Sequence, residues 1–470
     1  MIKFIKNYYS LILLFVIIFI SRLPFLSAGY GVEEDSWGIA LEAFNSNISG
    51  SYEPSRLPGH PVQELVFSAI WGVGPIVFNG LCALFSAIGV LFFALILKHF
   101  HFKHSIIAAY AFAFLPVYYI TSTYTIDYSW TEAFVLISLY ALLKNKLIVC
   151  GLFLGLAVGC RITSGAMLIP FIIIVWEQKN NFKNLGAFLK MFLPMSIVAL
   201  LAFTPIIQKY GISFFMYYDQ FPYPPLTKVL YKLIPGVFGL IGTMALIGSI
   251  LVILFNKKKQ QVSTSFSNGL DKKIIYAAIV IIILYIISYF RLPQKSGYMI
   301  PVIPFVIILF GYYLNGRNFK DLCICFIISS FLFSINLTDR LRGSEYSKYA
   351  FIFKLSGQEI FVDPFTGPVF SDYSKRKQKM EYTHQVIRKT ANINSKTVII
   401  AGWWRNEILV TLIPLPKNKY VEYVSYINEA EIKNHLAKGY SIYYLPEQQI
   451  YNDQRYNMNI TTSISQPFEL

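Results

Sequence analysis

Charged side chains are scarce in this chain. They account for 14% of its 470 residues, whereas 55% are hydrophobic and 17% are aromatic. In water-soluble domains about a quarter of the residues are charged, so this composition, with a mean hydropathy of +0.51, excludes an ordinary soluble protein. The five cysteines all lie in apolar segments, which excludes a domain that is held together by disulfides.

Long apolar segments take the place of the missing charge. A helix needs roughly 20 apolar residues to cross a bilayer, and on that basis we expect about eleven spans. They are expected at residues 8–26, 74–97, 105–121, 129–143, 147–160, 163–176, 191–208, 233–255, 274–290, 298–314 and 321–337. The predicted fold class is therefore an α-helical polytopic membrane protein.

The charges that are present divide between the two sides of these spans. Lysine and arginine dominate the loops on the side of the N-terminus, whereas the acids lie mainly in the other loops. Because basic loops stay in the cytoplasm, we expect a multi-pass plasma-membrane protein with a cytoplasmic N-terminus and an extracytoplasmic first loop, residues 27–73. The net charge of +16 comes largely from the basic loops, which favour anionic membrane lipids as partners and not nucleic acid.

The chain divides into two regions of different composition. Residues 1–337 form the membrane region, and residues 338–470 form a tail of mixed composition. In the tail, residues 397–401 and 440–445 have the pattern of short buried strands, and Asn428 can cap a helix between them. We therefore expect a small extracytoplasmic α/β domain after the membrane region.

Three consecutive acids, Glu33, Glu34 and Asp35, open the first long loop. Charge near a bilayer is expensive, so such a cluster usually serves catalysis, ion binding or helix capping. Apolar residues then recur every three or four positions, which predicts a helix along the membrane interface. These residues are Trp37, Leu41, Phe44 and Ile48. One acid would suffice to stabilise the dipole of that helix, so three in a row favour a functional site.

The far end of the same loop reads Arg56-Leu-Pro-Gly-His-Pro-Val-Gln-Glu64. An acidic cluster just after the first span, this R-x-P-G-x-P-x-x-E stretch before the second span, many spans and an exported C-terminal domain together resemble the GT-C superfamily of glycosyltransferases. By pattern the chain is most similar to the family-39-like protein O-mannosyltransferases and to the lipid A aminoarabinose transferase type.

The resemblance implies a polyprenyl-phosphate sugar as donor, a glycan, lipid or protein as acceptor, and inversion at the sugar. It also implies that a first-loop acid is the general base, because a hydroxyl is a poor nucleophile until a carboxylate takes its proton. The family commonly has an Asp-Glu pair here, whereas this chain has Glu-Glu-Asp. We expect Asp35 as the base, ahead of Glu34 and then Glu33, since Asp35 begins the interfacial helix with a short, rigidly held side chain. The tail is expected to serve acceptor access more than the chemical step.

A departing lipid phosphate needs cationic side chains to hold its charge. Arg291 and Lys295 stand in an outer loop with Tyr298, and such an arrangement before a proline-marked span is common in the family. The alternative is that both cations only anchor span ends by snorkelling. Arg161 is a reserve phosphate ligand, and at membrane depth it needs a partner, either that phosphate or an acid such as Asp127. Asp127 is itself better suited to cap the helix that follows it.

Metal binding has little support in the sequence. His60 and Glu64 are four residues apart, but Pro61 lies between them, and one histidine with one acid is a weak metal signal. Some enzymes of the family use a divalent cation and others do not, so metal dependence stays open. No organic cofactor is expected. Arg56, His60 and Glu64 are site candidates because they share a loop with the three acids.

The function predicted from these residues is an inverting membrane glycosyltransferase that acts on the outer face of the membrane. One alternative is a transporter or lipid-linked glycan flippase in which Arg161 and Asp127 line a pathway. Against it, the chain shows no repeat of the kind that many transporters have. Another alternative is a glycan polymerase or ligase with a pyrophosphate-linked donor. Such proteins usually carry their catalytic arginines in a large late loop, whereas the charged loop comes first here.

Overall fold

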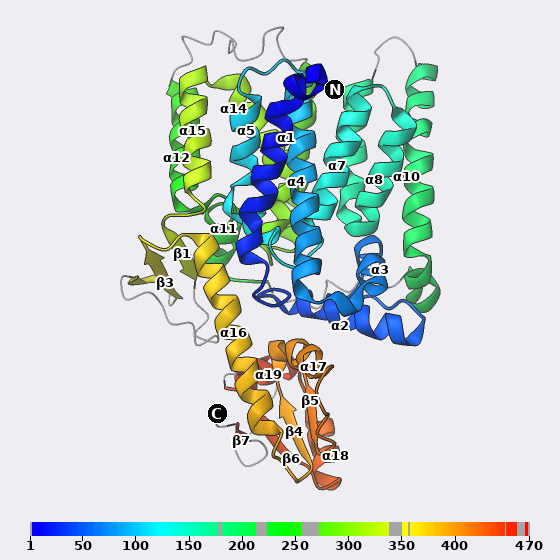
Figure 1. Cartoon of the computed structure of the whole chain (residues 1–470), viewed down its shortest axis with the longest axis vertical. Coiled ribbons are helices and arrows are strands. Elements are labelled where there is room, and N and C mark those ends of the chain that lie inside the picture. Colours follow the sequence, from blue (N-terminus) through cyan, green and yellow to red (C-terminus); the bar gives the residue numbers. More distant parts are fainter. Residues whose placement is uncertain are drawn as a thin grey trace.

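A bundle of helices forms the larger part of the molecule, and a small domain hangs from one end of it (Figure 1). The N-terminus lies at the opposite end of the bundle from that domain (Figure 1). The computed structural model describes residues 2–176, 181–212, 223–255, 272–337, 350–355, 358–446, 448–457 and 466–468.

The helices of the bundle correspond closely to the predicted spans. They are α1 (Ile2–Arg22), α4 (Pro75–His99), α5 (Ser105–Ala113), α6 (Pro116–Thr121), α7 (Tyr128–Leu143), α8 (Leu147–Cys160), α9 (Leu168–Val175), α10 (Asn181–Tyr210), α12 (Pro235–Phe255), α13 (Lys272–Arg291), α14 (Ile303–Tyr313) and α15 (Gly316–Ile328). Five helical segments are long and apolar enough to cross a bilayer, and shorter apolar helices occupy four further predicted spans. The protein is therefore an integral membrane protein, and the number of its spans stays a prediction.

Several predicted spans are not single straight α-helices. Pro116 has no backbone N–H to continue α5, so a new helix, α6, begins at that residue. Short 3-10 segments, Ile162–Met167 and Ser296–Val302, precede α9 and α14. The last predicted span, 321–337, runs past its helix, because α15 ends at Ile328 and the chain enters a strand at Ser334. An apolar run of this length does not by its pattern distinguish helix from strand.

Three short helices lie at the end of the bundle that faces the small domain. They are α2 (Glu34–Ser49), α3 (Pro61–Ala69) and α11 (Leu226–Leu233), and α2 lies across the bundle end (Figure 1). The helix expected after the acids is thus present, but its buried face differs from the predicted one. Trp37, Ile39, Ala40 and Ala43 are buried, whereas Ile48 is 66% exposed.

The region after α15 contains two sheets. β1 (Ser334–Leu337), β2 (Phe351–Leu355) and β3 (Gln358–Asp363) form an antiparallel sheet of order β1-β3-β2. β4 (Thr397–Ile400), β5 (Val421–Val424), β6 (Ser441–Tyr444) and β7 (Gln466–Pro467) form a parallel sheet of order β5-β4-β6-β7. Its helices are α16 (Pro368–Thr390), α17 (Arg405–Leu412), α18 (Glu429–Ala437) and α19 (Gln448–Tyr456). The fold class expected from the sequence, a polytopic helical protein with a small C-terminal α/β domain, is confirmed.

Local signals in the tail are also confirmed. The two predicted strands are β4 and β6, which pair in parallel at the centre of the second sheet. Asn428 and Glu431 form a reciprocal capping box at the start of α18. Gly439, with a φ of +80°, follows the helix in the left-handed region that glycine adopts at little cost.

Helix α16 connects the two parts of the molecule. It runs from the end of the bundle to the parallel sheet (Figure 1), and it contacts α6 at the bundle end and α17 in the domain. Helix α17 in turn packs on α2. A 3-10 segment, Gly402–Trp404, joins β4 to α17, so the carboxyl end of this central strand leads into the helix that packs on α2.

Candidate active site

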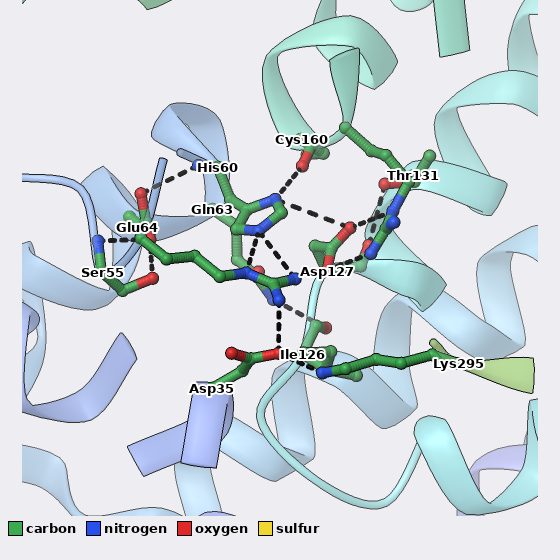
Figure 2. Close-up of polar contacts among 12 residues, drawn as sticks. Asp35, Ser55, His60, Gln63, Glu64, Ile126, Asp127, Thr131, Cys160 and Lys295 are labelled. Carbon is green, nitrogen blue, oxygen red and sulfur yellow. Dashed lines mark hydrogen bonds and ion pairs between the residues drawn. The ribbon is translucent and has the colours of Figure 1, made fainter. Parts of the chain in front are cut away.

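Asp35 is the centre of an ion-pair cluster at the end of the bundle. Its Oδ2 accepts hydrogen bonds from Nη1 of Arg56, at 2.5 Å, and from Nζ of Lys295 (Figure 2). Lys295 also donates to Glu33. The structure therefore brings two of the three predicted acids together with a loop arginine and a predicted phosphate ligand that is 260 residues away from Asp35 in the sequence.

The position of Arg56 depends on the buried carboxylate of Glu64. This carboxylate accepts hydrogen bonds from the backbone N–H groups of Ser55 and His60, both at 3.0 Å, and from the hydroxyls of Ser55 and Tyr52. A carboxylate with four donors fixes the path of the loop between Tyr52 and the start of α3. Glu64 is thus engaged in shaping the loop that presents Arg56 and His60.

His60 lies behind Arg56 and is oriented by a backbone group. Its Nδ1 is 2.7 Å from the carbonyl oxygen of Cys160 at the end of α8 (Figure 2). Because a carbonyl oxygen can only accept, Nδ1 carries the proton in this contact, and Nε2 accepts from Nε of Arg56 at 3.4 Å. His60 therefore supports the side of Arg56 that is turned away from Asp35.

Arg161 and Asp127 form the next layer of the cluster. The guanidinium makes two hydrogen bonds to the buried carboxylate, Nε to Oδ2 at 2.6 Å and Nη2 to Oδ1 at 2.9 Å. The rings of Tyr128 and Tyr298 lie 4.3 and 5.2 Å from the guanidinium carbon. The expected partner of Arg161 is confirmed, whereas the expected helix cap is wrong, since the Asp127 side chain makes no cap hydrogen bond to α7. A buried arginine without a counter-charge would cost more than an uncapped helix end.

The two cations predicted in the loop after α13 occupy different places. Lys295 is inside the cluster, and its side chain is 20% exposed. Arg291 is the last residue of α13 and is exposed. Among the residues that the structure describes, the ion pairs of Glu33 and Asp35 involve Lys295 and Arg56 and not Arg291.

The three acids have different electrostatic surroundings. Burial acts to raise the pKa of Asp35, but Arg56 and Lys295 hold it well below its usual range. Glu34 is the opposite case: burial, and next the charge of Asp35, raise its pKa to about 7, although the cations Lys379, Lys295 and Arg405 act against the rise. Within the described part of the chain, Glu34 is the one acid of the three whose carboxylate makes neither a hydrogen bond nor an ion pair.

Two cations of α16 contact the first loop, and sequence reasoning did not find them. Arg376, 1% exposed, donates to the carbonyl oxygens of Phe25 and Thr123, each at 3.1 Å. Lys379 donates to the carbonyl oxygen of Val32 and pairs with the buried carboxylate of Glu407 on α17, both at 3.1 Å. In the sequence these residues belong to a run of basic side chains that is typical of a solvated helix face, so composition gives no signal for them.

No group of three or more His, Cys, Asp and Glu side chains suited to a metal ion occurs among the described residues. His60 contacts the Cys160 carbonyl and Arg56, and Glu64 contacts four donors. The sequence spacing that suggested these two residues as a metal pair therefore has another structural explanation, the shaping of the loop.

Comparison with known proteins gives a match at the level of structure. No protein-family model and no curated protein matches the sequence. The structure is similar to ArnT from Cupriavidus metallidurans bound to undecaprenyl phosphate, with a TM-score of 0.43 and 16% identity over 64% of this chain and 59% of that chain. For the apo state of that protein the TM-score is 0.45, with 15% identity over 64% and 58%. The chain thus spans less than two thirds of the ArnT chain.

Proposed function

We propose that this protein is a membrane glycosyltransferase that moves a sugar from a polyprenyl-phosphate carrier to a hydroxyl of an acceptor. The observation that carries the proposal is the cluster at the bundle end, where the acids at the start of α2 adjoin Lys295 and Arg56. A transfer of this kind needs a carboxylate to take a proton and cations to hold a departing phosphate. With the N-terminus cytoplasmic, this end of the bundle faces the outer side of the plasma membrane.

The donor phosphate binds between Lys295 and Arg56 in this proposal. Both cations converge on one oxygen of Asp35, so a phosphate that binds next to this carboxylate finds two donors that Asp35 already holds in place. Arg161 is largely neutralised by Asp127 and is the reserve ligand. Arg291, exposed at the end of α13, is the outermost candidate.

Glu34 is the proposed general base, and this reverses the order expected from the sequence. A base works best when its pKa is close to the operating pH, and Glu34 meets that condition. Asp35 is committed to Arg56 and Lys295 and holds these cations in position. In the reaction the acceptor oxygen attacks C1 of the sugar and its proton passes to Glu34. The bond between C1 and the phosphate oxygen breaks, so the configuration at C1 inverts.

Mass spectrometry of the lipids that co-purify with the protein tests the donor class directly. We expect a polyprenyl-phosphate sugar with the wild type and a much reduced amount with Lys295→Met. Glu42→Gln, also on α2, is the control and should retain the lipid, because among the described residues Glu42 accepts its hydrogen bond from Asn45 of the same helix and is not part of the ion-pair cluster. A pyrophosphate-linked glycan would support the polymerase or ligase alternative, and the absence of any prenyl lipid would contradict the proposal.

A further inference from the structure

A cavity of about 180 Å³ lies between the bundle end and the first sheet, apart from the ion-pair cluster. Its walls come from α6, α11, α12, β1 and α16, and one wall residue is Val32, which directly precedes the acids. In Figure 1 α11, α12, β1 and α16 lie on one side of the bundle end, whereas α3 and α8, which position Arg56, His60 and Arg161, lie on the other. Val32 of the cavity wall is directly followed by Glu33, which belongs to the ion-pair cluster, so the cavity and the cluster adjoin at this point of the chain.

The wall formed by the membrane helices is apolar. Pro116 and Ile120 of α6 and Leu240 of α12 line it, together with the glycines Gly236 and Gly239. Gly239 has a φ of +69°, in the left-handed region that favours glycine, and the chain of α12 is kinked there. The space next to the two glycines is filled by the side chains of Ser296 and Ser329, so the apolar surface of this wall comes from Pro116, Ile120 and Leu240.

The wall formed by the tail is polar. Lys375 donates to Oδ1 of Asn336 at 2.7 Å, and Nδ2 of Asn336 lies 3.3 Å from Oγ of Ser371. Asp372, one residue further along α16, lies 2.9 Å from Nε of Arg376. This wall thus contains a hydroxyl, an amide, a carboxylate and the ammonium group of Lys375, all of which can hydrogen-bond the hydroxyls of a polar headgroup.

We propose that this cavity binds the headgroup of a membrane-embedded amphiphile that carries hydroxyl groups, and that this amphiphile is the acceptor. The division into an apolar and a polar wall matches a molecule with one end in the bilayer. Pockets for drug-sized ligands have volumes of about 300 Å³ or more, so this smaller cavity takes one compact headgroup. The assignment as acceptor rests on the proposed function, whereas the binding of an amphiphile does not.

The partners of the charged groups in the polar wall favour a hydroxyl ligand. Lys375 already donates to Asn336 and Asp372 is paired with Arg376, whereas a sugar or glycerol hydroxyl can donate to the Asp372 carboxylate. Because Val32 lines the cavity and directly precedes Glu33 and Glu34, a headgroup bound there lies next to these acids. Donor and acceptor thus approach the acids from opposite sides, as an in-line displacement at C1 requires.

Photo-crosslinking with an octyl β-D-glucoside that carries a diazirine at the end of its chain tests this site. The full-length protein is held in lipid nanodiscs, and the labelled peptides are mapped. We expect labelling of α6 or α12 that octyl glucoside displaces and that neither glucose nor farnesyl phosphate displaces. Equal displacement by free glucose would point to a soluble ligand, displacement by farnesyl phosphate would point to the donor, and either result would overturn the proposal.

Cavity-filling variants make the test specific. Leu240→Trp fills the apolar wall and should lower labelling about tenfold or more, as a loss of roughly 1.4 kcal/mol in binding would. Ile247→Trp, at an exposed apolar position of the same helix, should label like the wild type. Ser371→Leu fills the opposite wall and is the second variant if Leu240→Trp does not fold. Undiminished labelling in a folded filling variant would refute the site.

Donor cleavage distinguishes failure of this inference from failure of the proposed function. Hydrolysis of a polyprenyl-phosphate sugar by water is measured in the wild type and in the control Ile247→Trp, and both should cleave donor at the same rate because Ile247 lies outside the cavity and the ion-pair cluster. If the wild type labels as expected but cleaves no donor, the amphiphile site stands and the proposed function fails. If the wild type cleaves donor but does not label, the proposed function stands and the cavity assignment fails.

Discussion

Nζ of Lys379 lies 3.1 Å from the backbone carbonyl oxygen of Val32, the residue that precedes the three acids. A helix of the C-terminal region therefore contacts the start of the loop that carries the three acids, and Arg376 on the same helix contacts Phe25 a few residues earlier. From the sequence we expected the tail to serve acceptor access more than chemistry. The contacts of α16 support a second role, the placement of the proposed base.

Amide substitutions should separate the roles of Glu34 and Asp35. Glu34→Gln keeps the size of the side chain but cannot accept a proton, so we expect kcat to fall roughly 10²-fold or more with little change in the KM for donor. Asp35→Asn loosens Arg56 and Lys295, so the KM for donor should rise as well. Steady-state kinetics measures both, with Glu42→Gln as the control. A wild-type kcat for Glu34→Gln would remove it as the base.

The activity should depend on pH near neutrality. Glu34 must be deprotonated to accept the proton, and its pKa is raised to about 7 by burial and by Asp35. Consequently kcat/KM should rise with pH through about 7 and level off above it. Measurements of kcat/KM between roughly pH 5.5 and 8.5 would reveal this rise. A flat profile there would instead favour Asp35, whose pKa is low.

Removing Lys379 should shift that pH profile. Lys379 lowers the pKa of Glu34, so Lys379→Met should move the acid limb of kcat/KM to higher pH. The single substitution also removes the ion-pair partner of the buried Glu407 carboxylate. The double variant Lys379→Met/Glu407→Gln removes both charges of this pair, so that no unpaired buried charge is left, and it should show the same shift.

Lys377→Met, an exposed cation on the same helix, is the matched control for Lys379→Met. It should leave the profile in place. A shift of equal size in the Lys377 variant would show that the effect comes from the overall charge of α16 and not from the contact at Val32.

The two cations of the loop after α13 should differ in their effect on donor binding. Lys295→Met removes a charged hydrogen bond, and we expect donor affinity to fall about 10- to 100-fold. Arg291→Met should have a smaller effect, since Arg291 is exposed. Equilibrium binding of a polyprenyl phosphate to the purified variants gives both values. Equal losses in the two variants would contradict the assignment of Lys295 as the main ligand.

The orientation in the membrane can be measured by cysteine labelling. A membrane-impermeant reagent applied from outside should reach a cysteine introduced at Ser51 or Asn418, because both positions belong to the end of the molecule that carries the small domain. It should not reach one at Gln260, which lies outside the described residues and is predicted to be cytoplasmic. Labelling at Gln260 and not at Ser51 would reverse the orientation.

The sequence predicted the elements of the site better than their partners. Length and hydropathy located the helices, and the acid run located the start of α2, because these signals are local. The partners were harder to predict: Asp127 pairs with Arg161 across 34 residues, although its local position suggested a cap. Arg291 and Lys295 were equivalent by composition, and only the fold places Lys295 beside Asp35. Such choices depend on contacts between distant segments, which a periodic pattern does not encode.

The contacts of Arg376 with two much earlier segments also bear on the order in which the site is assembled during synthesis. Its guanidinium donates to the carbonyl oxygens of Phe25 and Thr123, which precede it by 351 and 253 residues. The ribosome therefore makes both loops, and the membrane helices between them, long before the side chain that joins the loops exists. Until α16 has been translated, these carbonyl groups have no guanidinium to bind. A chain interrupted after α15 would thus contain Asp35 with its partners Arg56 and Lys295, but it would lack the contacts of α16 with Phe25 and Val32.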